Sequence, residues 1–277
     1  MKNIETLDWK TSLWEKLALS TVALTIIISI MDLIYAPIFT NETVSAKAQV
    51  IGQDIVNLVL AVPILLYSLR LAKKNSFKAR TINIGVLAYL AYTFLSYCVI
   101  FKLNQGFLLY TAAFGVSFYA TIIGLTGINL EKIEISVSPG VKKRTPYALS
   151  IILLIIVLLW TPDIVNYYLN NQIPATLTLD NVHTLIIPFQ DFSIVLPLTL
   201  ITIWLLRKEE KLGYVLAPIV LVKALSIALA VIGMIVFMQI MGTPAVLGQI
   251  VVFLIGSVII GWYTRYYYNG IEITESA

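Results

Sequence analysis

Three ionisable residues lie within long apolar stretches of the sequence: Asp54, Asp191 and Lys223. Charged side chains are costly in an apolar environment, and inside membrane segments they tend to mark solute or ion pathways. A carboxylate can bind a cationic or hydrogen-bonding solute, and an ammonium group can pair with either carboxylate. We therefore take these three residues as the core of a candidate solute-binding site.

Lys223 makes the strongest demand on its surroundings. It follows the expected inner edge of its apolar stretch by nine residues, which places it ~13 Å deep in a helix. An ion pair with Asp191 or Asp54, loss of the proton, or a water-filled cavity would each accommodate it. All three solutions point the lysine toward other helices. We favour a polar cavity, and a purely structural ion pair is the alternative.

Several amides accompany these charges. Gln53 and Gln190 directly precede the two aspartates, and Asn57 and Gln249 also lie in apolar stretches. Amides can bond neighbouring helices and serve only assembly, and we favour that role for all four. Gln53 and Gln190 also adjoin the proposed site, so we include them in the candidate solute-binding set. Asp32 completes that set, although hydration alone would satisfy it near the outer end of its stretch.

Other chemistries lack the residues they need. His183 is the only histidine and Cys98 the only cysteine, so neither a multi-histidine metal site nor an intrachain disulfide is expected. We find no phosphate-binding loop, no paired carboxylate or Glu/His motif of the intramembrane enzymes, and no nucleophile beside a base. We accordingly assign no catalytic residue, no metal and no cofactor, and we expect no nucleic-acid partner.

Composition identifies the elements that must position these residues. Of the 277 residues, 59% are hydrophobic and 12% charged, whereas a soluble domain carries roughly 25% charged residues. No stretch alternates with a period of two, which excludes a β-barrel. The sequence therefore predicts an all-α integral membrane protein, a single transmembrane domain over residues 1–277. Its eight helices are expected at 17–36, 50–72, 81–101, 107–127, 147–167, 185–206, 214–238 and 246–263.

Basic residues fix the expected orientation. Sixteen of the 19 lysines and arginines fall in the N-terminal segment, the C-terminal tail and the connections between helices 2–3, 4–5 and 6–7. By the positive-inside rule these segments are cytoplasmic. We expect a cell-membrane protein with both termini in the cytoplasm, and Asp32, Asp54 and Asp191 then lie in the outer half of the membrane.

The longest outer connection runs from Thr161 to Thr184. Thr161 can cap a helix and Pro162 can take its first position, so we expect a short surface helix beginning there. Such a helix acts either as a lid over a site or as an inert connector, and we favour the connector.

A weak internal repeat is visible in the second and sixth expected helices. Each carries a Gln-Asp pair in its outer half and an arginine sixteen residues after the aspartate. Each also has a mid-helix proline, Pro63 or Pro197, although the prolines follow the aspartates by nine and six residues. A duplication would give two parallel four-helix repeats, residues 1–130 and 144–277, related by an axis along the membrane normal.

The same motifs carry a family resemblance. Gly52-Gln53-Asp54 with Pro63, followed by Gln190-Asp191 with Pro197, Gly213-Tyr214 and Ala217-Pro218, resembles polytopic integral membrane proteins of prokaryotes. The likeness covers mainly helices 2–3 and 6–7, and it implies no activity.

These observations favour a permease-like protein that binds a small cationic or polar solute in an outward-facing acidic pocket. The first alternative is an accessory or sensor membrane protein whose polar residues are structural, and the second is an intramembrane enzyme acting on a lipid. Expected partners are the lipid bilayer and a small solute. Faces rich in small residues, such as Ala113, Ser117 and Ala120, can join helices within one chain or form a homo-oligomer.

Overall fold

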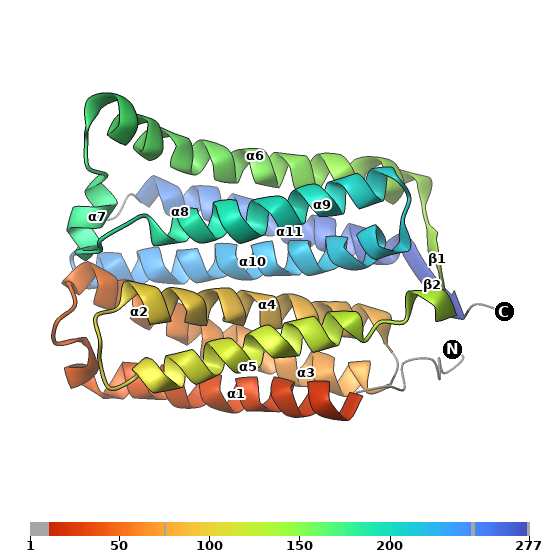
Figure 1. The fold of residues 1–277 in the computed structure, drawn as a ribbon, viewed down its shortest axis with the longest axis horizontal. Helices are drawn as coiled ribbons and strands as arrows, with labels where there is room; N and C mark the ends of the chain where they lie inside the picture. Colours follow the sequence, from red (N-terminus) through yellow and green to blue (C-terminus); the bar gives the residue numbers. More distant parts are fainter. Residues whose placement is uncertain (1–10, 75, 245–246, 276–277) are drawn as a thin grey trace.

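The computed structural model describes residues 11–74, 76–244 and 247–275. Eight of its helical segments are long and apolar enough to cross a membrane, so the chain has the architecture of an all-α multi-pass membrane protein. They run side by side as a single elongated bundle (Figure 1). The expected number of membrane-spanning helices is therefore confirmed.

The helices and strands follow one another with short connections. In order they are α1 (Thr11–Ile34), η2 (Ala36–Phe39), α2 (Val44–Val56), η3 (Asn57–Ala61), α3 (Val62–Ala72), α4 (Phe77–Ile100), α5 (Phe107–Thr126), η4 (Leu130–Lys132), β1 (Ile133–Val137), α6 (Pro139–Asn170), α7 (Ala175–Asp180), α8 (Ile186–Gln190), η5 (Asp191–Val195), α9 (Leu196–Arg207), α10 (Lys211–Ile240), α11 (Leu247–Asn269) and β2 (Ile271–Glu275).

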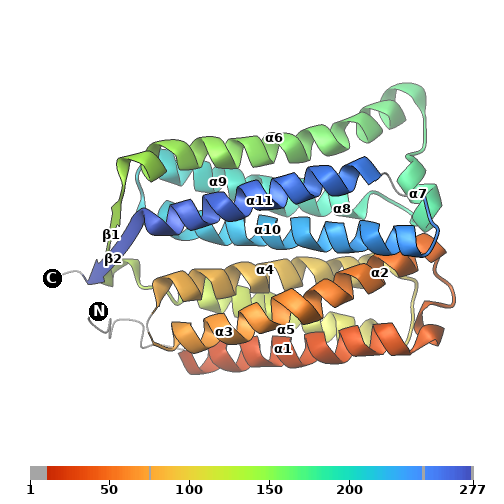
Figure 2. The ribbon, with the colours of Figure 1, turned by 180° about the vertical axis from the view of Figure 1, so that it is seen from behind.

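The two halves of the chain form two halves of the bundle. Helices α1–α5 lie together on one side and α6–α11 on the other (Figures 1 and 2). They meet where α10 packs against α4 and α2. In α4, 67% of the apolar stretch is buried, against 6% in α6, so α4 is central and α6 presents most of its surface to lipid.

Glycines allow this contact between the halves. A Cβ atom on Gly52 of α2 would collide with the Gly233 carbonyl of α10, and one on Gly233 would lie 2.7 Å from the Gly52 oxygen. The two helix backbones therefore touch directly. The expected small-residue face of α5, which includes Ala113, Ser117 and Ala120, is also buried within this chain.

Two of the membrane-spanning segments are interrupted by a π-helical turn. In the first, the Val62 amide bonds to the Asn57 carbonyl, and in the second the Leu196 amide bonds to the Asp191 carbonyl. Pro63 and Pro197 follow each turn at the second position of the resumed helix. Proline lacks an amide donor and crowds the preceding turn, and a π turn is one way in which a helix accommodates that disruption.

The outer connection differs from the expectation. Helix α6 continues through Pro162 to Asn170, and the Thr161 hydroxyl bonds to the Val157 carbonyl instead of capping a new helix. Asn171 ends α6 in the left-handed conformation, with φ 52°. The short helix is α7, whose Asp180 accepts hydrogen bonds from Gln49 of α2.

A small sheet at the end of the bundle was not expected. Strands β1 and β2 pair antiparallel, and Ile135 lies opposite Ile273. The strands share the sequence Ile-Glu-Ile followed by Ser136 or Thr274. Each strand follows the last long helix of its half, so segments at corresponding positions in the two halves pair with each other.

Candidate functional site

Helix α4 organises the polar interior of the bundle. Tyr92 and Ser96 contact residues of the second half, whereas Tyr89, Thr93 and Tyr97 contact residues of the first. Its position between the halves allows one helix to serve both sets. The Gln-Asp pairs of α2 and α8–η5 both dock on this helix.

Asp191 lies in the first of two polar clusters. Its Oδ1 accepts a hydrogen bond from the Tyr92 hydroxyl at 2.9 Å, and its Oδ2 accepts one from Trp160 Nε1 of α6 at 2.8 Å. The side chain is buried and is the first residue of the π turn η5. Both carboxyl oxygen atoms are therefore hydrogen-bonded within the protein.

Lys223 of α10 is the ammonium near this cluster. Its Nζ lies 4.2 Å from the centre of the Tyr92 ring, a distance typical of a cation–π contact. It is close enough to Asp191 for electrostatic attraction, yet it forms no hydrogen bond or ion pair with any residue that the structure describes. A direct ion pair, one of the three arrangements considered for Lys223, is therefore not present among the described residues, and Tyr92 contacts both charges.

The amides beside the aspartates have different surroundings. Gln53 donates to Thr93 Oγ1 at 2.8 Å. Gln190 accepts from Ser96 at 3.2 Å through Oε1, while its Nε2 is buried without a partner among the described residues. Tyr92 and Ser96, which contact Lys223 and Gln190, are one helical turn apart on α4.

Asp54 lies in the second polar cluster. Its Oδ1 accepts hydrogen bonds from Ser29 at 3.0 Å, Tyr97 at 3.1 Å and Asn57 at 3.3 Å. Asn57 in turn accepts from the Tyr89 hydroxyl at 2.7 Å. The Asp54 side chain is fully buried. Asn57 begins the π turn η3 and thus has the same place relative to its proline as Asp191.

Asp32 belongs to the same cluster, contrary to the expectation that it is hydrated near the surface. It is 3% exposed, its Oδ1 accepts from the Tyr110 hydroxyl at 2.8 Å, and Ser29, one helical turn earlier on α1, donates to Asp54. Burial follows from packing, because α5 lies against α1 at this depth. Gln249, expected inside the bundle, is exposed on α11.

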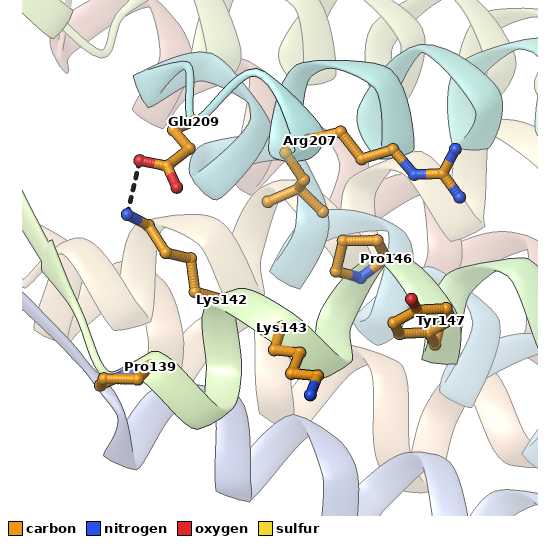
Figure 3. Close-up of a pocket in the computed structure, with 8 residues that line it drawn as sticks. Pro139, Lys142, Lys143, Pro146, Tyr147, Arg207 and Glu209 are labelled. Atoms are coloured by element: carbon orange, nitrogen blue, oxygen red, sulfur yellow. Dashed lines mark hydrogen bonds and ion pairs between the residues drawn. The ribbon is translucent and has the colours of Figure 1, made fainter.

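The structure thus separates residues that the sequence analysis had placed in one pocket. Asp54, Gln53 and Asp32 surround one face of α4, and Asp191, Gln190 and Lys223 surround another. Two hollows of the structure lie elsewhere. A groove of about 370 Å³ at one end runs between Lys142–Tyr147 and Leu206–Glu209 (Figure 3), and a hollow of about 410 Å³ is lined by residues of α7 and Pro244.

Aromatic residues of the site were missed by the sequence analysis. Tyr92, Tyr97, Tyr110 and Trp160 donate all but two of the hydrogen bonds that the three buried aspartates receive. Aromatic residues are common in membrane helices, so their type gave no signal. Tyr89, Thr93 and Tyr97 of α4 all contact the first half and follow one another at intervals of four, so their shared face was the available signal.

Comparisons with known proteins give no family: no family model matches the chain, and neither a curated protein nor a solved structure is significantly similar to it. Within the described part of the chain, no group of three or more histidine, cysteine, aspartate and glutamate side chains could hold a metal ion.

Proposed function

We propose that this protein is a permease-like protein of the cell membrane that binds a small polar solute beside α4, between Gln190–Asp191 and Lys223. The observation that carries the proposal is the pair of buried donors without acceptors, Lys223 Nζ and Gln190 Nε2. Leaving such donors unpaired is costly. A solute that presents a carbonyl or carboxylate group to them, and a cationic or hydrogen-bonding group to Asp191, satisfies the site.

The π turns support a functional role for these two segments. Single π turns inside α-helices are frequent at functional sites. Here the π turns begin at Asn57 and Asp191, and a proline lies six residues after the first residue of each turn. In this register Asn57, rather than Asp54, corresponds to Asp191. The pairing of β1 with β2 is consistent with two parallel repeats and an axis along the membrane normal.

Burial indicates an occluded conformation in place of the open, outward-facing pocket that we had expected. Asp191 and Lys223 are 8% and 6% exposed. With both termini in the cytoplasm, the basic groove of Figure 3 lies at the inner surface and α7 at the outer surface. The Gln49–Asp180 contact of α7 then lies on the outer side of the site, where opening would admit solute.

The accessory-protein alternative also has support. Both oxygens of Asp191 are hydrogen-bonded inside the protein, as expected if this cluster only joins α4, α6 and η5. The two functions differ in whether Lys223 needs an external partner.

Thermal unfolding of the purified protein with a panel of amino acids, polyamines and small carboxylates tests the proposal. A ligand at about 100 times its Kd stabilises the folded state by about 2.7 kcal/mol. We expect at least one solute to raise Tm in the wild type and not in Lys223→Met. Lys208→Met, the same substitution at an exposed lysine outside the site, serves as the matched control. If no solute of the panel raises Tm, the accessory role is favoured.

A further inference from the structure

A pair of buried carboxyl groups lies apart from the proposed solute site. Asp32 of α1 and Asp54 of α2 are 3% and 0% exposed. Ser29, one helical turn before Asp32 on α1, donates to Asp54, and the rings of Tyr97 and Tyr110, which donate to Asp54 and Asp32, pack 5.5 Å apart, so the two carboxyl groups lie in one cluster. In each residue Oδ1 receives all the hydrogen bonds from neighbouring donors, whereas Oδ2 is buried and receives none from a described residue. Two acceptor atoms are therefore left without a donor in one place.

We propose that Asp32 and Asp54 form a proton-binding site that holds one proton between them. Two carboxylates this close cannot both remain ionised in a buried environment, because each disfavours the charge of the other. A single proton converts one unpaired oxygen into a donor and satisfies the other. The pair then has a net charge of −1, and the hydroxyl and amide donors around it stabilise that charge.

The surrounding groups leave no other source of positive charge. The groups that face the pair are Ser29 of α1, Asn57 of η3, Tyr97 of α4 and Tyr110 of α5. The Tyr89 hydroxyl donates a hydrogen bond to Asn57. All of these are neutral donors, and no lysine or arginine from the described residues contacts either carboxyl group.

A proton fits this site better than a metal cation. A calcium ion takes six to eight oxygen ligands, whereas only two oxygen atoms of the cluster lack partners among the described residues. A proton needs no ligands beyond these two oxygen atoms. The site does not depend on solute transport, so the two proposals can fail separately.

Infrared difference spectroscopy of the full-length protein in detergent tests the site, because a protonated carboxyl group has a carbonyl band that a carboxylate lacks. We expect this band in the wild type at neutral pH and its loss in both Asp32→Asn and Asp54→Asn. In each variant the new amide group donates a hydrogen bond to the remaining carboxylate, which therefore stays ionised. Asp191→Asn is the matched buried control and should keep the band, because Asp191 already accepts from Tyr92 and Trp160.

A second variant keeps the test independent of folding defects. Tyr110→Phe retains both carboxyl groups and removes one donor to Asp32, so it should shift the band without abolishing it, whereas Tyr92→Phe should leave it in place.

Absence of the band from the wild type, or its survival in both aspartate variants, would overturn the proposal. A rise in Tm with sodium chloride but not choline chloride, lost in Asp54→Asn, would overturn it in favour of a sodium site.

Discussion

Tyrosine hydroxyl groups connect the buried charges of this protein to its helices. Tyr92, Tyr97 and Tyr110 each donate to an aspartate, and a hydrogen bond to a charged acceptor is worth about 1.5–3 kcal/mol. Tyr92 also places its ring against Lys223. One tyrosine therefore stabilises an anion through its hydroxyl and a cation through its ring, which lets both charges remain buried without touching.

Replacement of the two charged residues near Tyr92 should have unequal effects. Lys223→Met removes an ammonium that has no hydrogen-bond acceptor among the described residues, so we expect stability to change by less than about 1 kcal/mol or to rise. Asp191→Asn removes the anion nearest to a buried cation and should cost about 2 kcal/mol or more. Thermal unfolding in detergent measures both.

The double variant separates direct from indirect coupling. Lys223→Met in the Asp191→Asn background should restore most of the lost stability, because no buried cation then remains uncompensated. An equal loss in both single variants, fully recovered in the double, would instead indicate a close ion pair.

At the scale of helices, direct backbone contact between α2 and α10 joins the two halves. Gly52 and Gly233 face each other without room for a side chain. The π turns η3 and η5 add a second device, since each places a polar residue, Asn57 or Asp191, at the start of a widened turn. The glycine contact and the two π turns together determine how α2 and α8–α9 pack against the central helices α4 and α10.

Alanine at the glycine contact should therefore destabilise the bundle. In Gly52→Ala the new methyl group meets backbone atoms of Gly233, which cannot move as a flexible side chain would. We expect a loss of about 1–3 kcal/mol, measured by thermal unfolding. Gly115→Ala is the matched control, because no atom lies within 4 Å of its added Cβ. Comparable losses in the two variants would show that packing against lipid, not this contact, is responsible.

For the whole molecule, the charge asymmetry predicts which end faces the cytoplasm. We expect single cysteines at Asn41 and Gln172 to react with an impermeant thiol reagent in intact cells, and cysteines at Lys74 and Ser138 to react only after permeabilisation. All four positions are exposed. The measurement uses a Cys98→Ser background, since Cys98 is half-buried and is the only native thiol. The opposite labelling pattern would invert the orientation and move both buried clusters to the inner half of the membrane.

The eight helices and their order followed from the sequence, because every backbone group in lipid must bond within its own segment. The choice of Asp54, Asp191 and Lys223 as buried charges followed in the same way. Their partners did not. The lipid-facing and inward-facing sides of these helices are both apolar, so no periodic pattern marks the rotation of a helix about its axis. Only tertiary packing could bring Asp32 to Asp54, place Tyr92 against both Lys223 and Asp191, and pair β1 with β2. Packing selects those contacts through small residues such as Gly52 and Gly233, which determine how closely two helices approach and therefore which side chains meet between them.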